Sequence, residues 1–368
     1  MNRSSLMSFL SAVAVLLVGL LIGLVILLIS NPERAFEAFN TMITFGFSSM
    51  RNFGDVLLHA TPIILTGLSV AFAYKTGLFN IGAAGQFTVG AFVAVFISVQ
   101  FTFLPPALRI LVAIVGAAIA GALWGAIPGL LKAYRNVHEV ISCIMTNYIA
   151  MFLTNYLIIN HIFDQGRGTS LPLPTDSNLP SLGFENIFRE PLGAIYRSSN
   201  VNLGIVIAIL LAIAVYVILE KTSFGYELKA CGFNKDAAKY AGINQNRNIV
   251  FSFMICGALA GIGGALTYMS GTGLSMSITD TLSQQGFTGI SVAFLGLNHP
   301  IGIIFSGALV SYLSLGGTRM QPFGFSPEFV DIVVSIIIYF CAFVFLVKTA
   351  IETKLFGLGK KKEGGTTV

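Results

Sequence analysis

Long apolar runs separated by short polar segments dominate the pattern of this chain. A helix needs roughly 20 apolar residues to cross a hydrocarbon core about 30 Å thick, and fewer when it is short and packed among others. About ten runs meet this requirement. They predict transmembrane helices near residues 8–29, 55–74, 84–104, 107–131, 139–160, 202–220, 248–268, 283–297, 301–317 and 328–347. The expected fold class is all-α: one polytopic transmembrane domain over residues 1–368.

Two stretches break the apolar pattern, Gly77–Gly90 and Gln284–Gly296, because each mixes glycines, amides and phenylalanine. Polar groups and glycine at membrane depth predict broken or re-entrant helices that line a cavity or are buried in protein. One stretch lies in each half of the chain, as expected for two pseudo-repeated halves with a substrate path between them. The alternative is close helix packing through small residues, which is the interpretation we favour for Gly257, Gly261 and Gly264.

Two polar segments are expected outside the membrane. Within residues 31–54, large apolar residues recur at helical spacing and predict a helix along the membrane surface: Phe36, Phe39, Ile43 and Phe47. Residues 161–201 form a long extracellular loop rich in proline, serine and charge. This loop is either a docking surface or a solvated connector.

Composition supports a membrane protein, since 55% of residues are hydrophobic and 10% are charged, against about 25% charged in soluble domains. The first run continues apolar from Phe9 to Ile29 without a cleavage pattern, so it is expected to remain as an anchor. Most of the 21 Lys and Arg residues fall in the segments that are cytoplasmic if both termini are cytoplasmic. Topology therefore explains the net charge of +5, and no nucleic-acid partner is required.

Four cysteines are present. Three fall inside predicted spans and Cys231 falls in a cytoplasmic loop, so no disulfide is expected. Their spacing matches no metal site.

The predicted spans carry no Asp, Glu, Lys or Arg through their middle. Because intramembrane charges are retained mainly for ion and proton pathways, proton coupling is disfavoured, while sodium coupling through carbonyls and hydroxyls stays open. No H-E-x-x-H, G-x-S-x-G or G-x-x-x-x-G-K-[ST] pattern is present, so the chain is not expected to be an enzyme. An ATP-driven role requires another subunit.

Residues 221–247 form a short charged segment between two apolar runs, as expected of a cytoplasmic coupling loop. Asp236, Ala237, Ala238 and Gly242 spell D-A-A-x-x-x-G. This is a near match to the E-A-A-x-x-x-G loop through which membrane subunits of ABC importers engage their ATPases, although the usual I-x-L-P that follows is missing.

With these residues in view, the chain resembles the permeases of bacterial ABC importers in the branched-chain amino acid and simple-sugar superfamily, and looks most like nucleoside (guanosine-type) permeases. The resemblance rests on ATPIILTGLSVAFAYKTGLFNIGAAGQF at 60–87, HEVISCIMTNYI at 138–149, AGIN at 241–244, GALAGIGGAL at 257–266 and GFTGISVAFLG at 286–296. It implies a multi-pass protein of the bacterial plasma membrane, surrounded by lipid. Its implied partners are an ABC ATPase subunit that binds ATP and Mg, a second permease chain and an extracellular substrate-binding lipoprotein. No cofactor is expected in this chain.

The coupling loop is expected to form one or two short helices that dock in a groove of the ATPase. The alanines are small enough for that groove to close around them, and the charged residues can set the register through ion pairs. The candidate coupling residues are Glu227, Lys235, Asp236, Ala237, Ala238, Lys239, Ala241 and Gly242. The alternative is an ordinary solvated loop.

A nucleoside needs an apolar face for its base, amides for the base edges and hydroxyl partners for the sugar. The candidate substrate-path residues supply these groups: Asn80, Gln86, Asn147, Asn155, Gln284, Gln285, Thr288, Phe79, Phe87 and Phe287. For each amide the alternative role is a hydrogen bond between helices.

The sequence thus predicts the permease subunit of an ABC importer for nucleosides, which works by alternating access. Three alternatives stay open. They are the same machine carrying simple sugars or branched-chain amino acids, a sodium-coupled carrier, and an intramembrane scaffold without transport.

Overall fold

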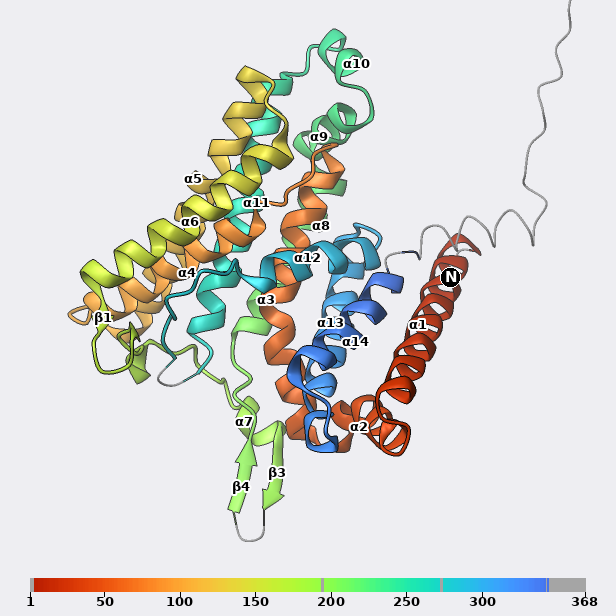
Figure 1. The fold of residues 1–368 in the computed structure, drawn as a ribbon. Helices are drawn as coiled ribbons and strands as arrows, with labels where there is room; N and C mark the ends of the chain where they lie inside the picture. Colours follow the sequence, from red (N-terminus) through yellow and green to blue (C-terminus); the bar gives the residue numbers. More distant parts are fainter. Residues whose placement is uncertain (1–2, 193–194, 272–273, 342, 344–368) are drawn as a thin grey trace, which may run out of the picture. The chain divides into compact units, whose positions relative to one another are not determined.

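The computed structural model describes residues 3–192, 195–271, 274–341 and 343 (Figure 1). Helices dominate it and confirm the predicted all-α membrane fold. The longer helices are α1 (Arg3–Ser30), α2 (Ala35–Ser48), α3 (Met50–Lys75), α4 (Ala83–Gln100), α5 (Pro106–Arg135), α6 (Glu139–His161), α8 (Gly204–Lys221), α11 (Gln245–Tyr268), α12 (Gln284–Leu295), α13 (Pro300–Thr318) and α14 (Pro327–Cys341). The shorter ones are α7 (Phe184–Ile187), α9 (Ser223–Phe233), α10 (Lys235–Tyr240), and the 3-10 turns η1 (Thr175–Ser177) and η2 (Gln321–Phe323).

Among the described residues, seven helical segments are long and apolar enough to cross a membrane. They contain α3, α4, α5, α6, α8, α11 and α13. The apolar part of α1, Ala14–Ser30, is shorter. The predicted span 283–297 corresponds to α12, whose 12 residues cover only about 18 Å at 1.5 Å per residue. A helix of this length is too short to cross a core of about 30 Å by itself, and a re-entrant course for α12 stays a prediction.

The chain divides into two compact units, 1–42 with 317–368, and 43–316. In the described part of the first unit, α1 packs on α14, and the small Gly19 and Gly23 allow both backbones to approach at Ile337. Residues 342 and 344–347 of the span predicted at 328–347 lie outside the described residues.

In the second unit, α11 packs against α3, α4 and α5. Glycines make this close packing possible. A methyl group on Gly257 or Gly261 would overlap the backbone of α5, and one on Gly264 would overlap the backbone of α4. These three glycines therefore serve helix packing, as the sequence indicated.

The segment 161–201 is held firmly against the helices of the second unit. Phe163–Asp164 (β1) pairs with Thr169–Ser170 (β2), and Arg189–Leu192 (β3) pairs with Ile195–Ser198 (β4). The Ser199 hydroxyl donates to the Asp55 carboxylate at 2.6 Å. The Arg109 guanidinium, 1% exposed, lies 2.5 Å from the Asp176 carboxylate. Burying a charge is costly unless it is paired, so Asp176 stabilises Arg109 inside α5 and ties the segment to that helix.

Helix α2 is amphipathic, as the spacing within 31–54 predicted. Phe36, Ile43 and Phe47 are exposed, whereas Ala38 and Met42 are buried. Its placement along the membrane surface stays a prediction.

Candidate functional site

Three predicted path residues form a buried amide cluster, Asn80, Gln86 and Asn147. The Asn80 Nδ2 donates to Gln86 Oε1 at 2.9 Å and to the Ser69 hydroxyl at 3.1 Å, and Gln86 Nε2 donates back to Asn80 Oδ1 at 3.3 Å. From α6, Asn147 accepts from the Gly85 N–H at 2.8 Å and donates to the Ile81 carbonyl at 3.0 Å. These bonds satisfy backbone groups freed where the chain is non-helical between α3 and α4. In this structure the cluster joins helices and lines neither of the two cavities described below.

Other predicted path residues meet at a cavity of about 480 Å³ between α4, α6, α11 and α12, which we call the polar cavity. It brings together Phe87, Asn155, Gln284 and Gln285 from the sequence-based set. The further residues lining it are Thr88, Ala91, Met151, Thr267, Tyr268, Met276, Ser277, Thr279, Thr281, Leu282 and Ser283. Pockets for small molecules typically measure about 300–1,000 Å³, so this cavity is large enough for a small solute.

Hydrogen bonds fix part of the polar wall and leave part of it free. Asn155 Nδ2 donates to the Thr279 carbonyl at 2.8 Å, and the Ser283 hydroxyl donates to Gln285 Oε1 at 3.0 Å. Within the described residues, neither the Gln284 side-chain amide nor the Tyr268 hydroxyl has a hydrogen-bond partner. These free groups are available to a bound molecule.

The remaining predicted path residues lie elsewhere. Phe287 and Thr288 are on α12 but not among the residues lining the polar cavity, and the Thr288 hydroxyl donates to the Gln284 carbonyl of its own helix at 3.1 Å. Phe79 lines a second cavity. Thr88, Thr267, Tyr268 and the hydroxyls of 277–283 were not predicted from the sequence. The pair Thr267–Tyr268, polar residues that end the glycine-rich run of α11, was a signal that could have been used.

The predicted coupling loop forms two helices, α9 and α10. Asn234 caps α10 by accepting from the N–H groups of Asp236 and Ala237 at 3.0 and 3.1 Å. Gly242 ends it with φ +82°, and the Ile243 N–H donates to the Ala238 carbonyl. This local pattern of cap and left-handed glycine explains why D-A-A-x-x-x-G folds as one short helical turn.

Only some candidate coupling residues face outward. Asp236, Ala237, Lys239 and Ala241 are exposed, while Ala238 is 4% exposed. Ala238 therefore packs within the chain. Glu227 is half-buried and accepts from Asn248 Nδ2 at 3.2 Å, and the side chain of Lys235 lies outside the described part.

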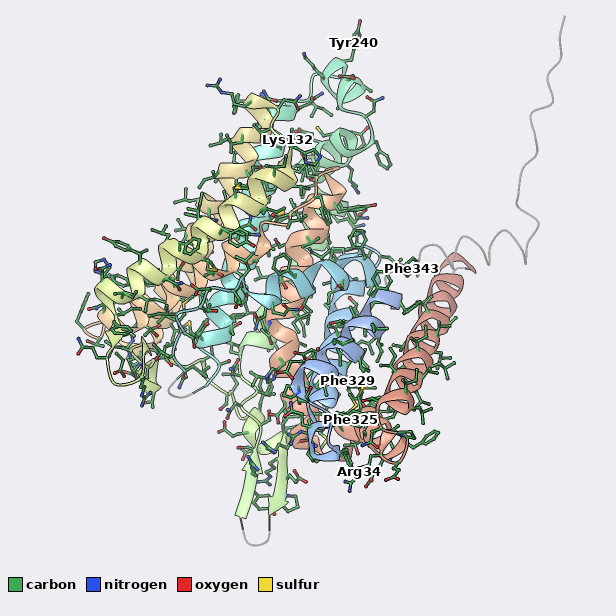
Figure 2. All side chains as sticks on the ribbon, viewed as in Figure 1. Arg34, Lys132, Tyr240, Phe325, Phe329 and Phe343 are labelled. Atoms are coloured by element: carbon green, nitrogen blue, oxygen red, sulfur yellow. The ribbon has the colours of Figure 1, made fainter. Side chains whose placement is uncertain are left out.

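Two exposed aromatic residues of this loop were not predicted from the sequence as coupling residues. Tyr240 is 98% exposed and Phe233 is 90% exposed. Figure 2 shows Tyr240 pointing away from the helices at the end of α10. Exposed aromatic side chains are enriched at protein interfaces, so Tyr240 at the end of α10 is suited to a protein partner.

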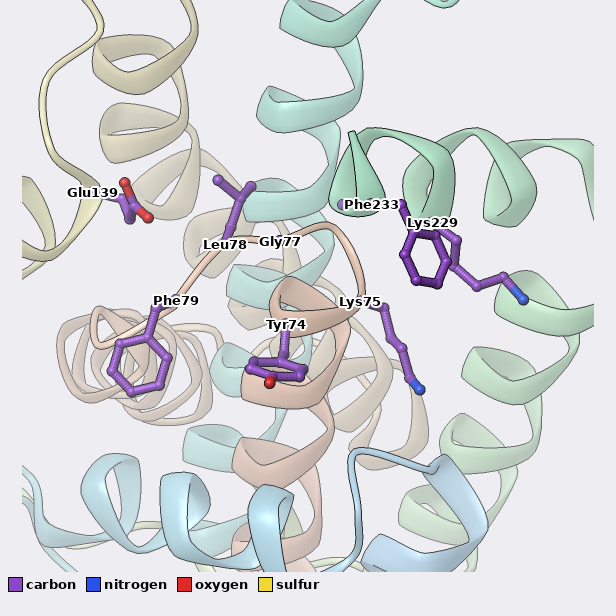
Figure 3. A pocket seen from close by; sticks show the side chains of 9 residues that line it. Tyr74, Lys75, Gly77, Leu78, Phe79, Glu139, Lys229 and Phe233 are labelled. Carbon is purple, nitrogen blue, oxygen red and sulfur yellow. The ribbon is translucent and has the colours of Figure 1, made fainter. Parts of the chain in front are cut away.

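The second cavity, about 580 Å³, lies where α3 ends, α6 begins and α9 passes (Figure 3). We call it the lysine cavity. It is lined by Tyr74, Lys75, Gly77, Leu78, Phe79, Glu139, Lys229, Gly232 and Phe233. Near it, burial and then the Lys75 ammonium lower the pKa of His299 against a smaller opposing effect of Glu220.

Cys143, Cys231 and Cys256 are buried and form no disulfide within the described residues, and the side chain of Cys341 lies outside the described part.

Comparisons with known proteins agree with this architecture. Residues 52–342 match the family model described as branched-chain amino acid transport system / permease component. The chain is 38% identical over 351 residues to the guanosine ABC transporter permease protein NupP of Bacillus subtilis (strain 168), covering 95% of each chain. It is 35% identical over 332 residues to the nucleoside ABC transporter permease protein NupB of Lactococcus lactis subsp. cremoris (strain MG1363), covering 90% of this chain and 89% of the relative.

A third relative is named for a different cargo. The chain is 31% identical over 338 residues to the glucose ABC transporter permease protein TsgB13 of Haloferax volcanii, covering 89% of this chain and 85% of the relative. No solved structure matches the chain.

Proposed function

This chain belongs to the permease-component family of branched-chain amino acid transport systems, and from that premise we propose that it carries nucleosides inward across the bacterial plasma membrane. The observation that carries the proposal is the polar cavity, where an aromatic ring, three amides and several hydroxyls meet in about 480 Å³. The names of the relatives NupP and NupB support the same cargo.

The cavity offers each part of a nucleoside a suitable neighbour. Phe87 and Met151 supply apolar surface for a planar base. Gln284 and Gln285 present amides, which can donate to and accept from the base edge. Thr267, Thr279 and Tyr268 provide hydroxyls for the ribose.

A simple sugar is the second candidate, since the relative TsgB13 is named for glucose. A sugar would use the same amides and hydroxyls but needs no aromatic plane. Competition separates the two: unlabelled nucleosides should abolish uptake of labelled guanosine, while excess glucose or leucine should not.

ATP hydrolysis in a separate ATPase subunit, which would bind ATP and Mg, supplies the energy in this proposal. That subunit docks on α9 and α10, a second permease chain completes the path, and a substrate-binding lipoprotein delivers cargo from outside. Both termini then lie in the cytoplasm, the side to which most Lys and Arg residues are assigned.

The test is uptake by the assembled transporter in proteoliposomes, with the lipoprotein in excess. Gln285→Ala should lower guanosine uptake severalfold at subsaturating guanosine and leave the yield of the complex unchanged. Asn160→Ala is the control, because Asn160 is an exposed amide of α6 that bonds only within its own helix. Normal uptake by Gln285→Ala, or competition by glucose as strong as by nucleosides, would refute the proposal.

A further inference from the structure

The lysine cavity is a separate site from the polar cavity. Helix α12 connects their surroundings, because Gln284 and Gln285 at its start line the polar cavity and Phe294 near its end packs on Tyr74 and Phe79, which line the lysine cavity. The Phe294 ring lies 5.5 Å from Tyr74 and 6.2 Å from Phe79, measured between ring centroids. Ten residues of helix separate the two ends by about 15 Å, so the cavities are distinct.

Its charge is positive and centred on Lys75. Glu139 is paired with Lys132 at 2.8 Å, and Lys229 is paired with Glu220 at 3.0 Å. Within the described residues Lys75 has no ion pair and no hydrogen bond from its ammonium. The ammonium is thus available to an anion, and Lys229 of α9 also lines the cavity.

Its remaining wall is aromatic. Tyr74, Phe79 and Phe233 line the cavity (Figure 3), and aromatic faces stack on nucleobases at about 1–3 kcal/mol per base. An uncharged nucleoside would leave Lys75 without a partner, and inorganic phosphate would leave the rings unused. A phosphorylated nucleoside uses both, because its base can stack while its phosphate meets the Lys75 ammonium.

The cavity also touches the coupling loop. Lys229, Gly232 and Phe233 belong to α9, and Gly232 lies directly on the backbone of Lys75 and Gly77 at the end of α3. A molecule bound here contacts both elements at once. It would stabilise the present arrangement of α9 against α3 and oppose any cycle in which the two separate.

We propose that the lysine cavity is a regulatory site for a nucleoside monophosphate, which binds from the cytoplasm and slows transport. The proposal rests on the proposed function for the cytoplasmic placement of α9. A reaction that phosphorylates the imported nucleoside would supply this ligand, so the phosphorylated product would limit further uptake.

The experiment measures guanosine uptake by proteoliposomes whose lumen holds ATP with or without millimolar guanosine monophosphate. The monophosphate should slow wild-type uptake severalfold. Lys75→Gln should remove most of that inhibition while keeping uptake without the monophosphate near wild type, and Lys75→Arg should retain it. Lys221→Gln is the control, because this exposed lysine at the end of α8 does not line the cavity.

Three results would overturn the proposal: no inhibition of the wild type, equal inhibition of Lys75→Gln, or equal inhibition by luminal guanosine or inorganic phosphate. Equal inhibition of Lys75→Gln would place the effect on the ATPase subunit.

A second measurement does not depend on transport. Photo-crosslinking of 8-azido guanosine monophosphate to the assembled complex should label this chain within Tyr74–Phe79 or Lys229–Phe233. Crosslinking that is confined to the ATPase subunit would contradict the site even if nucleoside uptake is shown. Labelling of the site without nucleoside uptake would leave the site intact and refute the proposed cargo.

Discussion

Gly77 and Gly232 lie in backbone contact, so that the end of α3 and the end of α9 touch without side chains between them. A Cβ atom on Gly232 would lie 2.6 Å from the Lys75 carbonyl oxygen, and one on Gly77 would lie 2.9 Å from the Gly232 Cα atom. Helix α3 is largely buried in the second unit. This backbone contact therefore holds the end of α9 against the helical core.

Gly232→Ala should disturb this backbone contact. The added methyl has backbone as its neighbour on α3 and cannot be accommodated by a rotamer change, so overpacking of about 1–3 kcal/mol is expected. Uptake by the assembled transporter should fall severalfold, together with nucleoside-stimulated ATPase activity. Gly271→Ala is the control, since a methyl there would make only an ordinary contact of 3.4 Å with Leu274. Equal activity of both variants would show that transport does not need the contact between α3 and α9.

Two adjacent glycines of α11 should respond differently to the same change. A Cβ atom on Gly263 would lie 3.4 Å from the Leu65 Cβ atom, an ordinary contact, whereas one on Gly264 would overlap the Phe87 carbonyl. Gly263→Ala should keep or slightly raise the thermal stability of the purified protein, because alanine favours helix by about 1 kcal/mol over glycine. Gly264→Ala should lower it clearly. Similar melting curves for the two variants would refute the tight α4–α11 packing.

Removing an amide from the buried cluster should cost stability. Asn147→Ala leaves the Gly85 N–H and the Ile81 carbonyl without partners, at about 1–3 kcal/mol for an unsatisfied buried group. Thermal unfolding in detergent should shift down for Asn147→Ala and stay unchanged for Gln285→Ala. If Asn147→Ala is as stable as the wild type and has lost only uptake, the result would support the substrate-path role that the sequence predicted for Asn147.

Tyr240→Ala should weaken the ATPase complex without affecting the fold. Its side chain is 98% exposed, so its removal takes almost nothing from the packing of the chain. Co-purification of the ATPase subunit should fall several-fold with an unchanged melting temperature. Ala238→Trp, in contrast, should weaken the complex and also lower the melting temperature, because Ala238 is buried. Full ATPase recovery with Tyr240→Ala would exclude this residue from the interface.

Topology can be tested with single cysteines in a background that lacks the four native ones. Thr175→Cys, on the exposed part of the 161–201 segment, should react with an impermeant maleimide from outside intact cells. Lys239→Cys, exposed on α10, should react only after permeabilisation. Reaction of both from the same side would contradict cytoplasmic termini with an extracellular 161–201 segment.

The helices and the glycine packing could be predicted from the sequence, because both depend on local patterns. The length of each apolar run determines the extent of α3, α5 and α11. Gly264 has no side chain that could contact a substrate, so a role in helix packing could be predicted for it. The cap and the left-handed Gly242 of the coupling loop are likewise local.

The partners of the polar groups could not be predicted in this way. Gln86 and Gln285 are both amides in glycine-rich stretches, yet one closes on Asn80 and the other lines a cavity. Whether an amide forms an internal hydrogen bond or lines a cavity depends on which helix packs against it. Hydrophobic periodicity does not identify that helix. Thr279 lies in an irregular segment whose hydrophobic positions show no periodicity. The burial of Ala238 follows from the turn between α9 and α10.

The pairing of Arg109 with Asp176 has an electrical consequence. Moving one elementary charge through a membrane potential of 100 mV changes the free energy by about 2.3 kcal/mol. Arg109 and Asp176 together carry no net charge, and the spans hold no ionised residue through their middle. With an uncharged nucleoside as cargo, a transport cycle displaces almost no charge across the field. The membrane potential then neither drives nor retards uptake, so a depolarised cell that still holds ATP would import at the same rate.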